Sequence, residues 1–118
     1  MFPYNIVEQQ GADLIAKCAA AGKGFIDMKP LAGGAIEDGR LALRYVLSNP
    51  NVTVTIPGMA DPAELTANLE GAANTAPLTP KEEEACQKVR DTLEPSSAAA
   101  ATTAPPVPWH PDPQCLPV

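Results

Sequence analysis

Apolar positions along this chain follow two different spacings. Short runs rich in β-branched and aromatic residues predict strands, and apolar residues three or four apart predict helices. The predicted strands are residues 2–7, 24–28 and 52–56, and the predicted helices are residues 12–21 and 41–47. Two more helices are predicted to begin at Asp61 and Thr79. This alternation is typical of α/β proteins with parallel strands.

Helix boundaries are marked by local signals. Asp61 and Thr79 are each followed by proline and, three residues after the cap, by glutamate, which is the pattern of a capped helix start. Asp38 can cap the helix before residue 41, and Gly22 supplies a left-handed stop after residue 21. We interpret the charged run 81–84 as a solvated first helical turn.

The third strand is almost continuously β-branched, which favours a parallel sheet covered on both faces. Three strands are too few to close a barrel and leave two open edges. A strand that opens at residue 2 also suggests that something precedes it. The pattern therefore resembles a piece of a larger structure.

Composition changes after Leu93. Half of the 14 prolines lie in residues 95–118, together with a tract of Ala, Ser and Thr. We predict a folded unit over residues 1–94 and a disordered tail over residues 95–118. The only histidine, His110, lies in that tail beside Trp109, and we expect it to be non-catalytic.

Charge and cysteine spacing exclude several classes of function. The net charge of −6 argues against binding to nucleic acid or to an anionic membrane surface. Cys18, Cys86 and Cys115 have no paired spacing, so neither a disulfide framework nor a metal site is expected. Without a signal peptide or a membrane-spanning run, the chain is predicted to be cytoplasmic.

Three loops follow predicted strands, at residues 8–10, 28–34 and 56–61. Ligands of parallel α/β folds gather at such strand ends. The second and third loops combine glycine with a following helix start, which favours a phosphate. Neither loop matches a known phosphate-binding motif, so a plain connecting turn stays open as the alternative.

Four stretches resemble the aldo/keto reductase family in order and spacing. They are YNIVEQQ, GFIDMKPLAGG, LALRYVLSNPNVTVTIPGMADPAELTANLE and PLTPKEEEA. The resemblance covers about residues 2–93 and is closest to a bacterial branch that often carries an iron–sulfur segment at its C-terminus. It implies the C-terminal half of a TIM-type (β/α)8 barrel, in an enzyme that reduces aldehydes or ketones with NADPH or NADH.

The resemblance also implies a set of cofactor-binding residues. Met28 matches the position that packs on the nicotinamide ring, and Lys29 can reach a phosphate. Asn68 matches an asparagine that contacts the adenine. The full implied set for NADP(H) or NAD(H) is Met28, Lys29, Pro30, Leu31, Gly33, Ile56, Pro57, Gly58 and Asn68.

The departures from the family are equally informative. The catalytic Asp, Tyr, Lys and His of the family belong to its first four strands, which have no counterpart here, so no catalytic residue is expected. Cys115 alone cannot supply an iron–sulfur cluster. No basic residue for a 2′-phosphate is evident between Gly58 and Glu64, which leaves NADP versus NAD open unless Lys29 or Arg40 compensates.

We therefore expect a partial aldo/keto reductase that holds cofactor weakly and is inactive alone. A complementary N-terminal half or self-association would complete its core. A non-catalytic self-associating α/β module or a gene remnant is the alternative. An unrelated small α/β domain, whose tail anchors a partner through Trp109, is a third.

Overall fold

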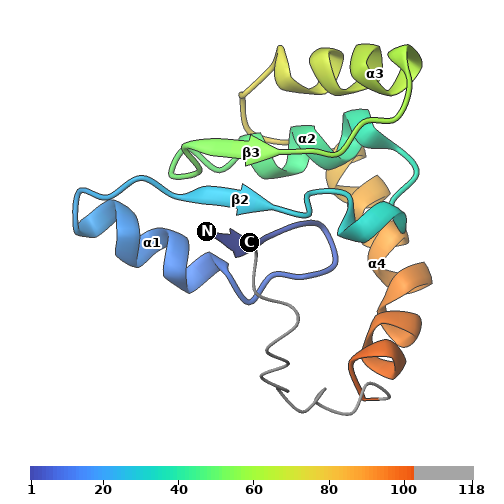
Figure 1. The fold of residues 1–118 in the computed structure, drawn as a ribbon, viewed down its shortest axis with the longest axis horizontal. Coiled ribbons are helices and arrows are strands. Elements are labelled where there is room, and N and C mark those ends of the chain that lie inside the picture. The colour runs from blue at the N-terminus through green and yellow to red at the C-terminus, as the bar shows by residue number, and fades with distance from the viewer. Residues whose placement is uncertain (103–118) are drawn as a thin grey trace, which may run out of the picture.

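A computed structural model describes the backbone over residues 1–102 and the side chains over residues 1–93. It has an α/β fold in which helices and parallel strands alternate (Figure 1), as predicted. The elements are β1 (Phe2–Pro3), α1 (Ala12–Ala20), β2 (Ile26–Met28), the 3-10 helix η1 (Ala32–Gly34), α2 (Gly39–Leu47), β3 (Val54–Ile56), α3 (Pro62–Ala72) and α4 (Pro80–Thr102).

The three strands form one open sheet in the order β1-β2-β3. Both neighbouring pairs are parallel, and Phe2 pairs with Asp27 while Ile26 pairs with Val54. Because the sheet does not close on itself within residues 1–102, β1 and β3 are its two edges. The carboxyl ends of β2 and β3 lie side by side, since Met28 pairs with Ile56.

The strands are shorter than the sequence pattern predicted. The predicted strand over residues 2–7 pairs with β2 only over Phe2–Pro3. Asn5 bends the chain away, because its Oδ1 accepts the N–H groups of Val7 at 3.0 Å and Glu8 at 2.8 Å. This side chain-to-backbone turn competes with strand pairing.

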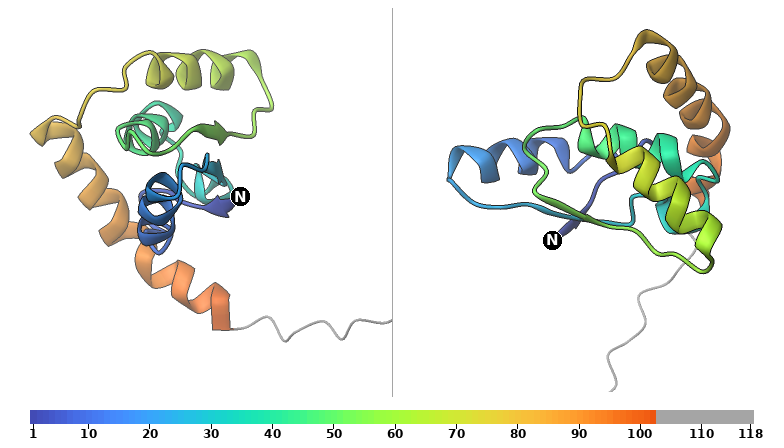
Figure 2. Two further views of the ribbon diagram at one scale, coloured as in Figure 1. Left: turned by 90° about the vertical axis from the view of Figure 1, so that its left-hand side faces the viewer. Right: turned by 90° about the horizontal axis from the view of Figure 1, so that it is seen from above.

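The prediction that β3 is covered on both faces is wrong within the described residues. Figure 2 shows α1 and α2 on the same side of the sheet. On the opposite side, Ile26, Val54 and Ile56 are 40%, 47% and 53% exposed. Side chains alternate between the faces of a strand, so these three residues form one apolar surface, named here the open sheet face.

Two clusters of apolar side chains make the core beneath the helices. The first holds Tyr4, Ile15, Phe25, Val46 and Val52. The second holds Ile6, Ile36, Ala42 and Cys86. Cys86 is fully buried, whereas Cys18 is only half-buried at the edge of the first cluster.

The predicted helix starts are confirmed in detail. The Asp38 carboxylate accepts the Leu41 N–H at 3.0 Å, and the Asp61 carboxylate accepts the Glu64 N–H at 2.9 Å. Each bond satisfies one donor that an α-helix leaves unpaired in its first turn. Gly22 has the left-handed φ of 69° that the predicted helix stop requires.

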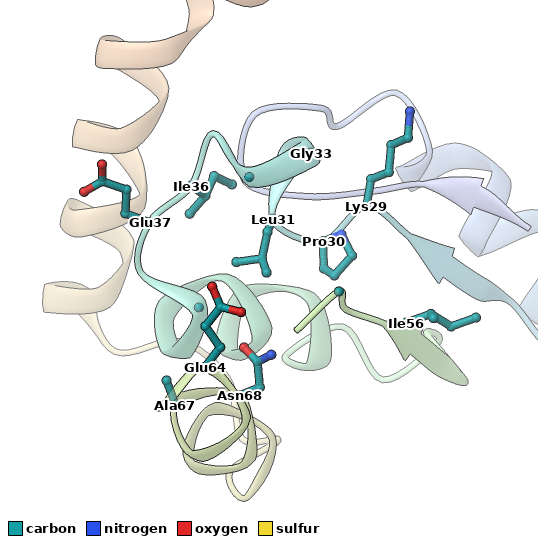
Figure 3. A pocket seen from close by; sticks show the side chains of 13 residues that line it. Lys29, Pro30, Leu31, Gly33, Ile36, Glu37, Ile56, Glu64, Ala67 and Asn68 are labelled. Atoms are coloured by element: carbon teal, nitrogen blue, oxygen red, sulfur yellow. The ribbon is translucent and has the colours of Figure 1, made fainter. Parts of the chain in front are cut away.

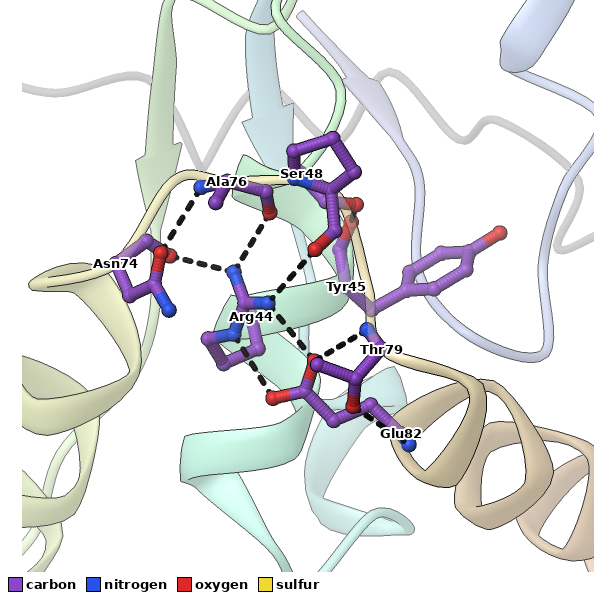
Figure 4. A network of polar contacts seen from close by, with 8 residues as sticks. Arg44, Tyr45, Ser48, Asn74, Ala76, Thr79 and Glu82 are labelled. Atoms are coloured by element: carbon purple, nitrogen blue, oxygen red, sulfur yellow. Dashed lines mark hydrogen bonds and ion pairs between the residues drawn. The ribbon is translucent and has the colours of Figure 1, made fainter.

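A buried arginine fastens α2 to the start of α4 (Figure 4). Arg44, which is 4% exposed, donates from Nη2 to the Glu82 carboxylate at 2.8 Å. Its Nη1 donates to the carbonyls of Asn74 at 2.6 Å and Ala76 at 2.9 Å. The hydrogen bond from Arg44 lowers the pKa of Glu82 to about 2. The interpretation of residues 81–84 as a wholly solvated turn is therefore wrong for Glu82.

The last helix continues beyond Leu93, where the sequence pattern predicted its end. Its backbone is helical to Thr102, across the alanine tract 98–101, which has high helix propensity. The rest of the predicted tail, with Trp109, His110 and Cys115, lies outside the described residues. Within residues 1–102, every helix is too short or too polar to cross a lipid bilayer.

Candidate ligand-binding cavity

A cavity of about 620 Å³ opens at the carboxyl ends of β2 and β3 (Figure 3). Its size lies within the roughly 300–1,000 Å³ range of small-molecule sites. Seven of the nine residues predicted to bind cofactor line it: Lys29, Pro30, Leu31, Gly33, Ile56, Gly58 and Asn68.

The other two predicted residues do not line the cavity. Met28 is half-buried and pairs with Ile56, so its side chain lies on the same side of the sheet as the open sheet face. Pro57 is half-buried between two lining residues, Ile56 and Gly58. The packing of Met28 on a nicotinamide ring stays a prediction.

The loop after β2 adopts an uncommon backbone. Lys29 and Ala32 have positive φ angles of 55° and 52°, and Gly33 and Gly34 have 69° and 96°. The left-handed conformation costs a residue other than glycine roughly 1–2 kcal/mol. The buried Asn5 side chain holds the loop in place, because its Nδ2 donates to the Lys29 carbonyl at 3.0 Å. Such strain is concentrated at functional sites.

Asn68 is the most unusual residue of the cavity. Its side chain is 4% exposed, and neither amide atom has a hydrogen-bond partner. An unsatisfied buried polar group costs about 1–3 kcal/mol, so it needs an explanation. A Cβ on Gly39 would come within 2.6 Å of Asn68 Oδ1, so the lack of a side chain at this position leaves space for the Asn68 amide.

The charges around the cavity are mostly negative. Lys29 is the one cation among the described residues that line it, and Glu37 and Glu64 are the two anions. The helices that begin there are already capped by Asp38 and Asp61. Capped helix ends attract an anion less than bare ends do, because part of their positive end is already compensated.

Several lining residues were not singled out by the sequence. Glu37, Glu64 and Gly39 lie on the cavity wall beside the predicted residues. The capping pattern at residues 61–64 was visible, but it indicated only a helix start. Arg40, considered as a partner for a 2′-phosphate, does not line the cavity. Among the described residues, no three His, Cys, Asp or Glu side chains are placed to hold a metal ion.

No known family model and no curated protein matches this chain. The family resemblance therefore stays a prediction.

Proposed function

We propose that this chain is the cofactor-side half of an aldo/keto reductase, an NAD(P)H-dependent oxidoreductase acting on aldehydes or ketones. The observation that carries the proposal is the orphaned amide of Asn68 inside a cavity lined by seven of the nine predicted residues. When bound, the cofactor supplies a hydride. The chain's own residues bind and orient it: Lys29 faces its phosphates and Asn68 its adenine.

The proposed architecture is half of a (β/α)8 barrel. In such a barrel the helices surround the strands and the inner face packs as a core. Helices α1 and α2 on one side, with the apolar open sheet face on the other, support this arrangement. The chain then works as one part of a larger barrel, in the cytoplasm, where the free thiols of Cys18 and Cys86 are stable.

The test is whether the purified chain binds the cofactor, measured by ligand-observed NMR. We expect weak binding of NADH, and we expect Asn68→Ala to reduce it by about tenfold, because the amide loses its role as donor and acceptor. Asn51→Ala removes an exposed asparagine away from the cavity and should change nothing. Thermal unfolding of both variants separates lost binding from lost folding. Absence of NADH and NADPH binding by the wild-type chain would refute the proposal.

Catalysis by the chain alone is not expected. The proposal assigns the proton donor for the carbonyl oxygen to the missing half, and without such an acid a carbonyl is reduced slowly. Oxidation of NADH and NADPH with a panel of aldehydes measures this directly. Turnover by the purified chain would contradict the assignment.

A second candidate function is a self-associating binding module. The open sheet face and the two unpaired sheet edges favour it, because both attract a further chain. Association with a second copy or with a complementary half would bury them. Light scattering distinguishes these states, and a monomer at micromolar concentration would contradict self-association.

A further inference from the structure

The charged groups of the cavity are separated in space. Figure 3 shows the Lys29 side chain on the far side of the cavity from Glu64 and Asn68. Lys29 extends from the loop after β2, whereas Glu64 and Asn68 come from the first two turns of α3. A ligand at the α3 end of the cavity therefore meets a carboxylate and an amide, with the Lys29 side chain far from both.

The α3 end of the cavity is unsuited to a phosphate. The Glu64 carboxylate accepts the N–H of Ala60, and the Asp61 carboxylate accepts the N–H of Glu64. These two bonds hold both carboxylates near the start of the helix. A phosphate placed there would be repelled by two negative charges, and no lining cation of the described residues comes from α3.

The same end is well suited to neutral polar groups. The buried Asn68 amide offers one acceptor and two donor positions that the protein leaves unused. A carboxylate beside it accepts hydrogen bonds from hydroxyl groups. In dinucleotide-binding folds, an acidic residue binds the ribose 2′-hydroxyl of NAD in this way.

We propose that the α3 end of the cavity accepts an unphosphorylated ribose, so that the chain binds NAD(H) in preference to NADP(H). Glu64 is the specificity-determining residue: its carboxylate accepts the 2′-hydroxyl and repels a 2′-phosphate. This inference rests on the proposed cofactor-binding function and decides between NADP and NAD, a choice that the family resemblance leaves open.

The test compares two probes that differ only in the 2′-phosphate, 5′-AMP and 2′,5′-ADP. Saturation-transfer NMR on the wild-type chain should show 2′,5′-ADP binding about tenfold more weakly than 5′-AMP. The Glu64→Gln variant keeps a side-chain oxygen that can accept the Ala60 N–H and removes the charge, so it should reduce this ratio at least about threefold. Glu70→Gln removes an exposed charge from α3 outside the cavity and should leave the ratio unchanged.

The outcomes separate the two proposals. Binding of 2′,5′-ADP as tightly as 5′-AMP by the wild-type chain would overturn the NAD preference and leave cofactor binding standing. An unchanged ratio in a folded Glu64→Gln variant would overturn the role of Glu64. Absence of binding by both probes and by NADH would overturn the cofactor site itself, and the preference with it.

Discussion

At the scale of single residues, the least expected group is Asp27. Its side chain is fully buried and links β2 to β3 and to the residue that follows β1. One oxygen accepts the N–H of Tyr4 at 2.9 Å and the other accepts the hydroxyl of Thr55 at 2.8 Å. Burial raises the pKa of Asp27 to about 6, although both hydrogen bonds act in the opposite direction.

This raised pKa predicts how stability depends on pH. Because the folded-state pKa lies above the unfolded-state pKa, folding favours the protonated acid. The stabilisation is complete below about pH 4 and is lost as the pH rises through about 6. We expect the free energy of unfolding to fall by up to about 3 kcal/mol across this interval. Asp27→Asn should abolish the fall, as measured by urea unfolding at several pH values.

The matched control is Asp13→Asn, which removes an exposed carboxylate from α1. It should retain the wild-type pH dependence, because it leaves Asp27 and both of its hydrogen bonds in place. The lowered pKa of Glu82 acts in the opposite sense and offsets part of the fall near pH 4–5, because the ordinary pKa of this group is 4.5. The difference between the wild type and Asp27→Asn therefore isolates the contribution of Asp27. A pH-independent wild-type stability between pH 4 and 6 would contradict the assignment to Asp27.

Residues such as Asp27 and Arg44 show why sequence reasoning missed part of the structure. Their partners are far along the chain: Asp27 bonds to Tyr4, and Arg44 to Glu82, 38 residues away. A pattern read within a short window contains no information about such pairs. For the cavity, glycine and proline in the sequence predicted where the loops lie. The presence of Glu64 in the cavity wall depends on how α3 packs, which the sequence pattern does not reveal.

At the scale of elements, the helices were more predictable than the strands. Caps such as Asp38 and Asp61 act within three residues, so their signals are local. Strand length depends on pairing with distant residues. Near the start of β3, the Phe25 carbonyl accepts the N–H groups of both Thr53 and Val54, and the regular pairing begins only at Ile26. The extent of each strand was therefore not readable from its own residues.

The contact between α2 and α3 depends on a glycine. A Cβ on Gly71 would lie 2.5 Å from the carbonyl oxygen of Arg40, which is closer than real side chains come to a backbone atom. We expect Gly71→Ala to lower the free energy of unfolding by about 1–3 kcal/mol despite the better helix propensity of alanine. Nucleotide binding should weaken as well, because α3 carries Asn68 and Glu64. Chemical denaturation and NMR titration measure the two effects.

Gly58→Ala is the matched control for stability. A Cβ there would meet nothing within 4 Å, so the free energy of unfolding should stay within about 0.5 kcal/mol of the wild type. Equal stability of Gly71→Ala and the wild type would show that α2 and α3 separate without cost. In that case, the close glycine contact would not set the position of α3.

At the scale of the whole molecule, the helices lie on one side of the sheet and leave an exposed apolar surface on the other. The helices α1 and α2 bury one face of the sheet, and the open sheet face has no cover among the described residues. Two unpaired edges flank it, and all strands run in one direction. The β1 edge of one copy can therefore pair with the β3 edge of another in the parallel sense, which would enclose both open faces.

This geometry predicts that the open sheet face drives assembly. We expect the wild-type chain to form dimers or larger species in light scattering, and Ile26→Thr combined with Val54→Thr to shift it towards the monomer. Threonine keeps the β-branched shape that strands favour, so the fold should persist. Leu14→Gln is the matched control, because Leu14 and Ile26 are both 40% exposed but Leu14 lies on α1. If light scattering gives the same molar mass for all three proteins in solution, then the open sheet face does not drive assembly.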